Sequence, residues 1–120
     1  MLRSIAGSFL TVALLSLSPT WAEAQERCRP IQFAQNQSSA EIRGTAPAEG
    51  GVCYTLATGE GQTARVRVLS GKNIIFNIEG VTDPRDDFEF RTQRKTYRIN
   101  VAQLMRSVTP EAFKVSVSVR

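Results

Sequence analysis

Apolar and polar side chains alternate in several short runs along this chain of 120 residues. The most regular run is 113–119, where Phe or Val at every odd position alternates with Lys or Ser. Successive side chains leave opposite faces of a β-strand, so each run buries one face and exposes the other. The pattern recurs at residues 52–57, 64–68, 74–78 and 97–101. It predicts short strands that border one hydrophobic core.

Turn-forming residues separate these runs. The segments 47–51, 59–61 and 70–73 are rich in Gly, Pro, Ser and Asn, which favour turns. We interpret residues 61–80 as a hairpin around the third turn, and we expect one or two helical turns at residues 102–108. About six to eight strands without a βα repeat predict an all-β protein, a small antiparallel β-sandwich or flattened barrel.

Residues 1–24 have the features of a cleaved signal peptide. A positive start at Met1-Leu2-Arg3 precedes a mostly apolar stretch from Ile5 to Leu17, and Ala22-Glu23-Ala24 has small residues where signal peptidase reads them. A retained anchor is the alternative, but the stretch is shorter than the roughly 20 residues that a spanning helix needs. We expect cleavage before Gln25, a periplasmic or secreted protein, and no stable membrane insertion afterwards.

The remaining residues are enough for one domain with one modest core. We divide it into an N-terminal extension, residues 25–49, and a β-sandwich core, residues 50–120. Cys28 and Cys53 are the only cysteines, and in an oxidising compartment we expect them to form a disulfide that ties the extension to the core. A redox pair is the alternative, but such cysteines usually lie close together as Cys-x-x-Cys.

The charge balance and the missing His limit the possible chemistry. The chain has 15 Lys and Arg, 11 Asp and Glu, a formal net charge of +4 and no His. Without His, the Ser-His, Cys-His and His-metal arrangements are excluded. A small positive charge on an exported protein argues against nucleic acid and suits an acidic protein cleft or a polyanionic envelope component. No motif indicates a cofactor.

Asp83, Asp86 and Asp87 form the obvious cluster of carboxylates. A glycosidase needs one carboxyl whose pKa is raised by burial, whereas a turn with Pro84 and Arg85 favours solvated, ionised groups. Calcium is a further alternative, but the spacing does not match the twelve-residue loop and its closing Glu. We therefore expect no catalytic residue and no metal site, and we do not expect an enzyme.

Basic side chains gather on outward strand positions. Arg65 and Arg67 share one face, and residues 91–98 contain three Arg and one Lys. Charge on an outward strand face is usually a solvated surface that resists edge pairing. The alternative interpretation is a cationic surface that speeds association with an acidic partner.

Several motifs resemble those of a known family. The motifs are Gly51 to Leu56, Gly61-Gln62, Ser70-x-x-Asn73-x-x-Phe76-x-Ile78, Tyr97-x-Ile99-x-Val101 and Phe113 to Val119. Their order resembles the strand succession of bacterial pre-peptidase C-terminal domains and, more narrowly, of the periplasmic inhibitors of goose-type lysozyme. The resemblance covers residues 50–120. It implies a β-sandwich whose loops block the cleft of a peptidoglycan hydrolase.

Such an inhibitor would offer Arg, Lys or Ser from a rigid loop to the acids of the enzyme cleft. The candidate residues for partner binding are Ser70, Lys72, Asn73, Arg85, Asp86, Asp87 and Arg91. Lys72 and Arg85 are the best candidates for pairing with carboxylates. The Asp86-Asp87 pair departs from this requirement, because it would bring negative charge toward an acidic cleft.

Two functions follow from these observations. The first is inhibition of a lysozyme or related peptidoglycan hydrolase, and the alternative is a non-catalytic module that binds envelope glycan or protein. Glycan binders usually stack sugars on exposed aromatic rings, whereas Tyr54 and Tyr97 fall on predicted core faces. Protein binding is therefore favoured. Pairing of exposed strand edges would allow a homodimer.

Overall fold

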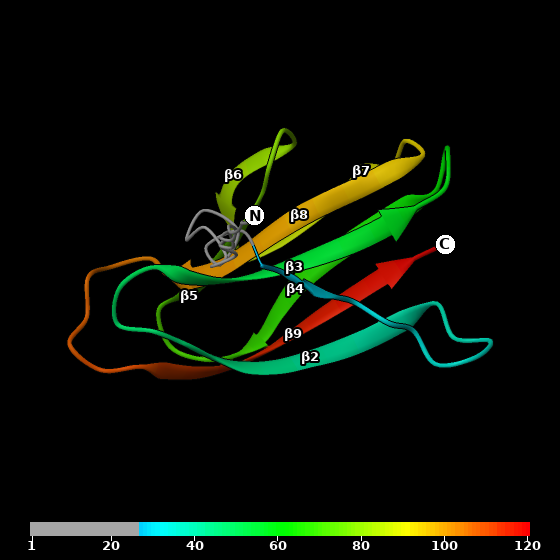
Figure 1. Ribbon diagram of the computed structural model, residues 1–120. Helices are drawn as coiled ribbons and strands as arrows, with labels where there is room; N and C mark the ends of the chain where they lie inside the picture. The colour runs from blue at the N-terminus through cyan, green and yellow to red at the C-terminus, as the bar shows by residue number, and fades with distance from the viewer. Residues whose placement is uncertain (1–26) are drawn as a thin grey trace, which may run out of the picture.

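The computed structural model describes residues 27–120, and this part of the chain contains no helix (Figure 1). The strands are β1 (Arg29–Pro30), β2 (Ser39–Ala46), β3 (Gly51–Thr58), β4 (Thr63–Ser70), β5 (Ile74–Ile78), β6 (Thr82–Arg85), β7 (Asp87–Arg91), β8 (Lys95–Gln103) and β9 (Glu111–Val119). The signal peptide expected at residues 1–24 lies outside the described residues.

The strands form two sheets that pack face to face. The first sheet has the order β1-β3-β8-β5-β6 and the second has the order β2-β9-β4-β7. Neighbours within each sheet are antiparallel except β1 and β3, which are parallel. The predicted all-β sandwich is confirmed. The described residues form nine strands, more than expected, because β1 and β6 are too short to show an alternating pattern.

The inward side chains of both sheets fill the core as the alternation predicted. On β9, Phe113, Val115 and Val117 are buried with at most 4% exposure. Tyr54 and Tyr97 are also buried, at 5% and 4% exposure, so neither ring is available to a sugar. Full burial of such a side chain contributes about 1.5–3 kcal/mol relative to leaving it exposed. This packing holds the two sheets together.

The predicted hairpin of residues 61–80 is wrong in its pairing. β4 pairs with β7 and β9, whereas β5 pairs with β6 and β8. The turn between β4 and β5 therefore carries the chain from one sheet to the other. The alternation identified both strands and their inward faces, because it reports which side chains are buried. It carries no information about which strand lies alongside.

The helical turn expected within residues 102–108 does not form. β8 continues to Gln103, and residues 104–110 then run as an irregular loop to β9. Leu104 and Met105 suggested a helix because they are apolar neighbours. Their side chains are 60% and 66% exposed, so they have no core surface against which a helix would pack.

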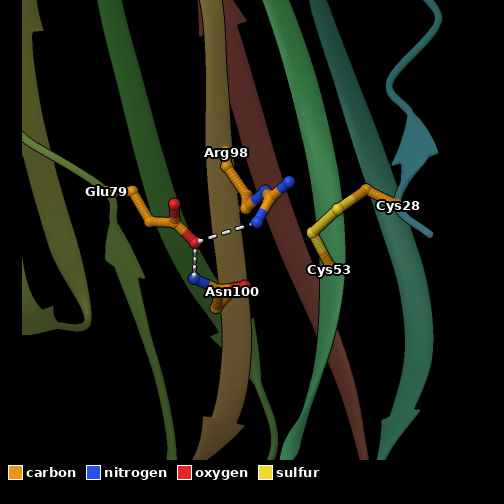
Figure 2. Close-up of a disulfide and its surroundings, with 5 residues drawn as sticks. All are labelled: Cys28, Cys53, Glu79, Arg98 and Asn100. Carbon is orange, nitrogen blue, oxygen red and sulfur yellow. Dashed lines mark hydrogen bonds and ion pairs between the residues drawn. A yellow bond between two sulfur atoms is a disulfide. The ribbon is translucent and has the colours of Figure 1, made fainter. Parts of the chain in front are cut away.

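The predicted disulfide between Cys28 and Cys53 is confirmed (Figure 2). It links the residue before β1 to the middle of β3. Next to it, Arg29 and Pro30 lie opposite Tyr54 and Thr55, and the Ile31 amide donates a hydrogen bond to the Thr55 carbonyl at 2.8 Å. The disulfide therefore fastens a very short strand to the edge of the first sheet.

Removal of this disulfide by Cys28→Ala with Cys53→Ala should lower the free energy of unfolding. The cysteines are 25 positions apart, and closing a loop of that length in the unfolded chain stabilises the native state by about 3 kcal/mol. Urea denaturation of the purified protein measures the change, with the oxidised wild type in the same buffer as reference. An unchanged unfolding midpoint would contradict the expectation.

Candidate functional site

Three connections meet at one end of the sandwich, which we name the loop end (Figure 1). They are residues 47–50 between β2 and β3, residues 71–73 between β4 and β5, and residues 104–110 between β8 and β9. Each connection crosses from one sheet to the other. The strand register places them together, because Ala46 lies opposite Glu111 in one sheet and Ile74 lies opposite Gln103 in the other.

Large apolar side chains are exposed at the loop end. Among the described residues, the exposed ones are Leu69 at 39%, Leu104 at 60%, Met105 at 66% and Val108 at 94%. Three belong to the loop 104–110, and Leu69 is the penultimate residue of β4. Exposed apolar side chains gathered on one surface are typical of sites that contact another protein.

Two hollows lie beside these apolar side chains. The first is lined in part by Leu69, Leu104, Ser70, Asn73 and Asp86. It brings the turn at residues 71–73 next to the connection between β6 and β7, where the Asp86 carbonyl accepts a hydrogen bond from the Val68 amide at 2.9 Å. The loop end therefore presents an uneven surface with polar groups at its base.

The second hollow contains an exposed cation. It is lined by Glu49, Arg106, Ser107 and Val108. Within residues 27–120, neither Arg106 nor Lys72 belongs to an ion pair shorter than 4.0 Å. The backbone amide of Lys72 donates to Glu111 Oε2 at 3.0 Å, which fixes the turn and leaves the ammonium group exposed. Both cations are thus available to an acidic partner.

Asn73 fastens the loop 104–110, the longest of the three connections at the loop end, to the turn at residues 71–73. Its φ of 63° is in the left-handed region that Asn tolerates better than most residues. The side-chain amide donates to the Met105 carbonyl at 2.8 Å and to Gln103 Oε1 at 3.2 Å, and Asn73 Oδ1 accepts from the Met105 amide at 2.8 Å. The Leu104 amide also donates to the Asn73 carbonyl at 2.8 Å. Asn73 therefore positions the loop from within.

Gln103 extends this network to the other two connections. Its Nε2 atom donates to the Thr109 carbonyl at 2.9 Å and to the Pro47 carbonyl at 3.2 Å. Gln103 Oε1 already accepts from Asn73, so a single side chain joins all three segments of the loop end. The exposed apolar groups are consequently held on a fixed backbone.

The remaining candidate residues lie elsewhere. Arg85 donates to Thr82 Oγ1 and to Asp83 Oδ1, both at 3.2 Å, and its guanidinium lies 5.7 Å from the Phe88 ring centroid. Arg91 is at the far end of β7, opposite Thr63. The first hollow thus brings Ser70, Asn73 and Asp86 together, with Lys72 in the same turn. The side chains of Arg85 and Asp87 bond to Asp83 and Arg65 instead, and Arg91 lies at the other end of β7.

The environment of Asp87 is the opposite of what a general acid requires. Arg65 donates from Nε to Oδ1 at 3.0 Å and from a terminal nitrogen to Oδ2 at 2.8 Å. These hydrogen bonds hold the pKa of Asp87 below its usual value. The side chain of Asp83 is 75% exposed. Within the described residues, no three His, Cys, Asp or Glu side chains are placed to hold a metal ion.

Sequence reasoning missed Met105, Arg106 and Val108 as surface residues. The available signal was the end of the two-residue alternation after Val101, followed by an apolar pair and a cation before Pro110. Apolar residues that continue past a strand into a Pro-terminated loop have no inward face to occupy. The exposure of these residues could therefore be predicted from the sequence, whereas the contact of Met105 with Asn73 depended on the topology.

Comparisons with known proteins agree on one architecture. The sequence matches no family model and no curated protein. In three dimensions, PliG of Aeromonas hydrophila, a periplasmic lysozyme inhibitor of g-type lysozyme, has a TM-score of 0.66 and 24% identity, over 78% of this chain and 96% of that chain. This chain has the PliG fold. A mutant PliG from Escherichia coli, also a periplasmic inhibitor of g-type lysozyme, has a TM-score of 0.62 and 18% identity, over 76% and 96% of the two chains.

The second kind of structural neighbour is the pre-peptidase C-terminal domain of a Bacillus anthracis collagenase. Its TM-score is 0.50 at 12% identity, over 79% of this chain and 96% of that domain. PliG and this domain are the two groups that the sequence motifs resemble, so the expected relationship is confirmed for the fold. These comparisons show the fold alone, so the chemistry of the candidate site is argued from the side chains of the loop end.

Asn73→Ala should destabilise the loop end. The variant removes the side-chain bonds to Gln103 and Met105, each worth about 0.5–1.5 kcal/mol, and it also places Ala at a positive φ. Asn36→Ala is the matched control, because Asn36 has a φ of 65° and makes no side-chain hydrogen bond to another described residue. We expect a larger loss of unfolding free energy for Asn73→Ala and faster amide exchange at Met105. Equal losses in the two variants would contradict the proposed role.

Proposed function

We propose that this protein is an exported periplasmic inhibitor that blocks the cleft of a lysozyme or related peptidoglycan hydrolase with its loop end. The observation that carries the proposal is the exposure of Leu104, Met105 and Val108 on the same loop as Arg106, a cation in no ion pair with another described residue, on the fold of PliG. The proposal assigns no catalytic step to the protein. Its action would be to occupy the cleft and keep substrate out.

The chemistry of the loop end suits an acidic cleft. Glycoside hydrolases of this kind hold a pair of carboxyl groups at the bond they cleave. Arg106 lies between Met105 and Val108 in the sequence, so a guanidinium that can bind a carboxylate through two parallel hydrogen bonds is flanked by apolar anchors. Lys72 adds a compact charge from the neighbouring turn. The apolar side chains would exclude water and strengthen both ion pairs.

Rigidity of the loop supports the same function. Asn73 and Gln103 hold the loop 104–110 to the neighbouring segments through side-chain bonds, and the strands on either side are anchored in the core. A loop that is already ordered loses little conformational entropy when it binds. The bound loop can therefore retain more of the interaction energy as affinity.

The proposed location rests on separate observations. The predicted signal peptide, the disulfide and the periplasmic PliG structures with the same fold all agree with an exported protein. In the part of the chain that the structure describes, no helix is long and apolar enough to cross a membrane. Disulfides also form and persist mainly in oxidising compartments.

An assay of peptidoglycan lysis by g-type and chicken-type lysozymes, with and without the purified protein, tests the proposal. We expect the wild type to slow lysis by at least one of them. Arg106→Ala should weaken inhibition about 30-fold, the effect of losing a binding hot spot worth about 2 kcal/mol. Lys72→Ala should weaken it less, because a single exposed ammonium makes fewer directed bonds.

One control variant makes the result specific, and one further variant tests another candidate residue. Arg94→Ala removes an exposed Arg from the connection between β7 and β8, away from the loop end, and should leave inhibition unchanged. Arg85→Ala tests whether the connection that follows β6 takes part. Full lysis in the presence of folded wild-type protein would overturn the proposal and favour the binding-module alternative. Equal losses for Arg94→Ala and Arg106→Ala would show that net charge, and not the loop end, is responsible.

A further inference from the structure

The outer face of the second sheet carries polar side chains in regular rows. These rows run across β2, β9, β4 and β7, as the strand register defines. One row contains Ser39, Ser118, Arg65 and Glu89, and the adjacent row contains Glu41, Ser116, Arg67 and Asp87. Arg43 and Lys114 lie opposite each other in a further row. Cations thus exceed carboxylates on this face.

A hollow in this face is lined entirely by hydrogen-bond donors. Its lining consists of Ser39, Arg65, Arg67, Ser116, Ser118 and Arg120, and we name it the serine-arginine hollow. A neighbouring hollow shares Arg65, Ser118 and Arg120 with it and adds Thr63 and Glu89. The two together form a polar track beside β9.

Most of these donors are unused within residues 27–120. Two hydrogen bonds to Asp87 fix the orientation of the Arg65 guanidinium. Arg65 also compensates the charge of that carboxylate. By contrast, the guanidinium groups of Arg67 and Arg120 belong to no ion pair shorter than 4.0 Å with another described residue. None of the hydroxyl groups of Ser39, Ser116 and Ser118 bonds to another described side chain or carbonyl. Carboxylates border the hollow, since Asp87 lies opposite Arg67 and Glu41 lies opposite Ser116 in the strand register. The lining itself contains several free donors and three cations.

The outer face of the first sheet has a different character (Figure 2). There, Glu79 Oε2 lies 3.7 Å from an Arg98 nitrogen and accepts a hydrogen bond from Asn100 at 3.1 Å. The disulfide between Cys28 and Cys53 lies on the same face. The cation on that face is already paired, so free guanidinium groups beside hydroxyl groups are a feature of the second sheet.

We propose that the serine-arginine hollow binds a phosphate-bearing oligosaccharide. A phosphate monoester carries a charge of about −1.5 to −2 and three acceptor oxygens, which suits two guanidinium groups and several hydroxyl donors better than the two oxygens of a carboxylate. Ser116 and Ser118 are about 7 Å apart along β9. They can bond to the sugar hydroxyls on either side of the phosphate.

A protein partner fits this hollow less well. Stable protein contacts centre on buried aromatic or apolar anchors, and the hollow has none in its lining. The exposed large apolar side chains lie at the loop end instead. Ser118 is seven residues along β9 from Glu111, or about 23 Å, so the ligand would not cover the loop end.

Nuclear magnetic resonance titration with a phosphopentamannose tests the inference, with unphosphorylated pentamannose and a hyaluronan tetrasaccharide as comparison ligands. Only the phosphorylated ligand should shift the amide signals around Arg67, Ser116 and Ser118 at low concentration. Arg67→Ala with Arg120→Ala should weaken its binding about tenfold or more. Arg67→Lys retains the charge but loses the paired donors, so it should give an intermediate loss.

Arg43→Ala is the matched control, because Arg43 is exposed on the same face but outside the lining of the hollow. It should change the affinity less than twofold, as expected for a screened charge. The inference is overturned by absence of binding, by shifts confined to other regions, by equal binding of either comparison ligand, or by equal losses in the control. Inhibition of lysozyme by the Arg67 variants should stay at the wild-type level, so this test and the test of the loop end can fail independently.

Discussion

Nearly every connection of this protein passes from one sheet to the other. Among the strands of residues 27–120, only β5 and β6 follow each other within a single sheet. Apart from the β5–β6 hairpin, neither sheet can therefore assemble from neighbouring strands, and the two must form together around the shared core, which demands contacts between distant parts of the chain. The same crossings place residues 47–50, 71–73 and 104–110 at one end. The loop end is thus a product of the topology that closes the core.

This topology also explains what could be predicted from the sequence. Burial of every second side chain is a local property, so the strand around Phe76 and the strand around Val115 were identified together with their inward faces. The partner of each strand depends on the whole chain, and the turn at residues 70–73 looks the same whether it joins paired strands or crosses between sheets. Within the candidate site, Lys72 was predicted from its turn. The contact of this turn with the loop 104–110 was not, because 32 positions separate Asn73 from Met105 and only the crossing pattern brings them together.

The basic side chains fall into two groups, those that form an ion pair with a carboxylate and those that do not. Arg65 and Arg98 lie close to carboxylates of their own sheets, and these contacts reduce the field they present to solvent. Arg106 and Arg67 form no ion pair shorter than 4.0 Å with another described residue, although Asp87 lies opposite Arg67 in the strand register. They lie on different surfaces, one beside apolar side chains and one beside serine hydroxyls. A count of charges does not separate these groups. The surroundings of each cation give the two surfaces different preferences for a ligand.

The short strand β1 has a further consequence for the first sheet. Without it, β3 would be an edge strand with a row of unpaired amide and carbonyl groups, which is a template for another chain. Two residues pair too weakly to stay in place alone, and the cystine between Cys28 and Cys53 keeps them there. The disulfide therefore keeps β1 paired with part of the edge of β3 that would otherwise be exposed. In reducing surroundings this constraint would be lost, and the backbone of β3 at Tyr54 and Thr55 would become open to pairing with another strand.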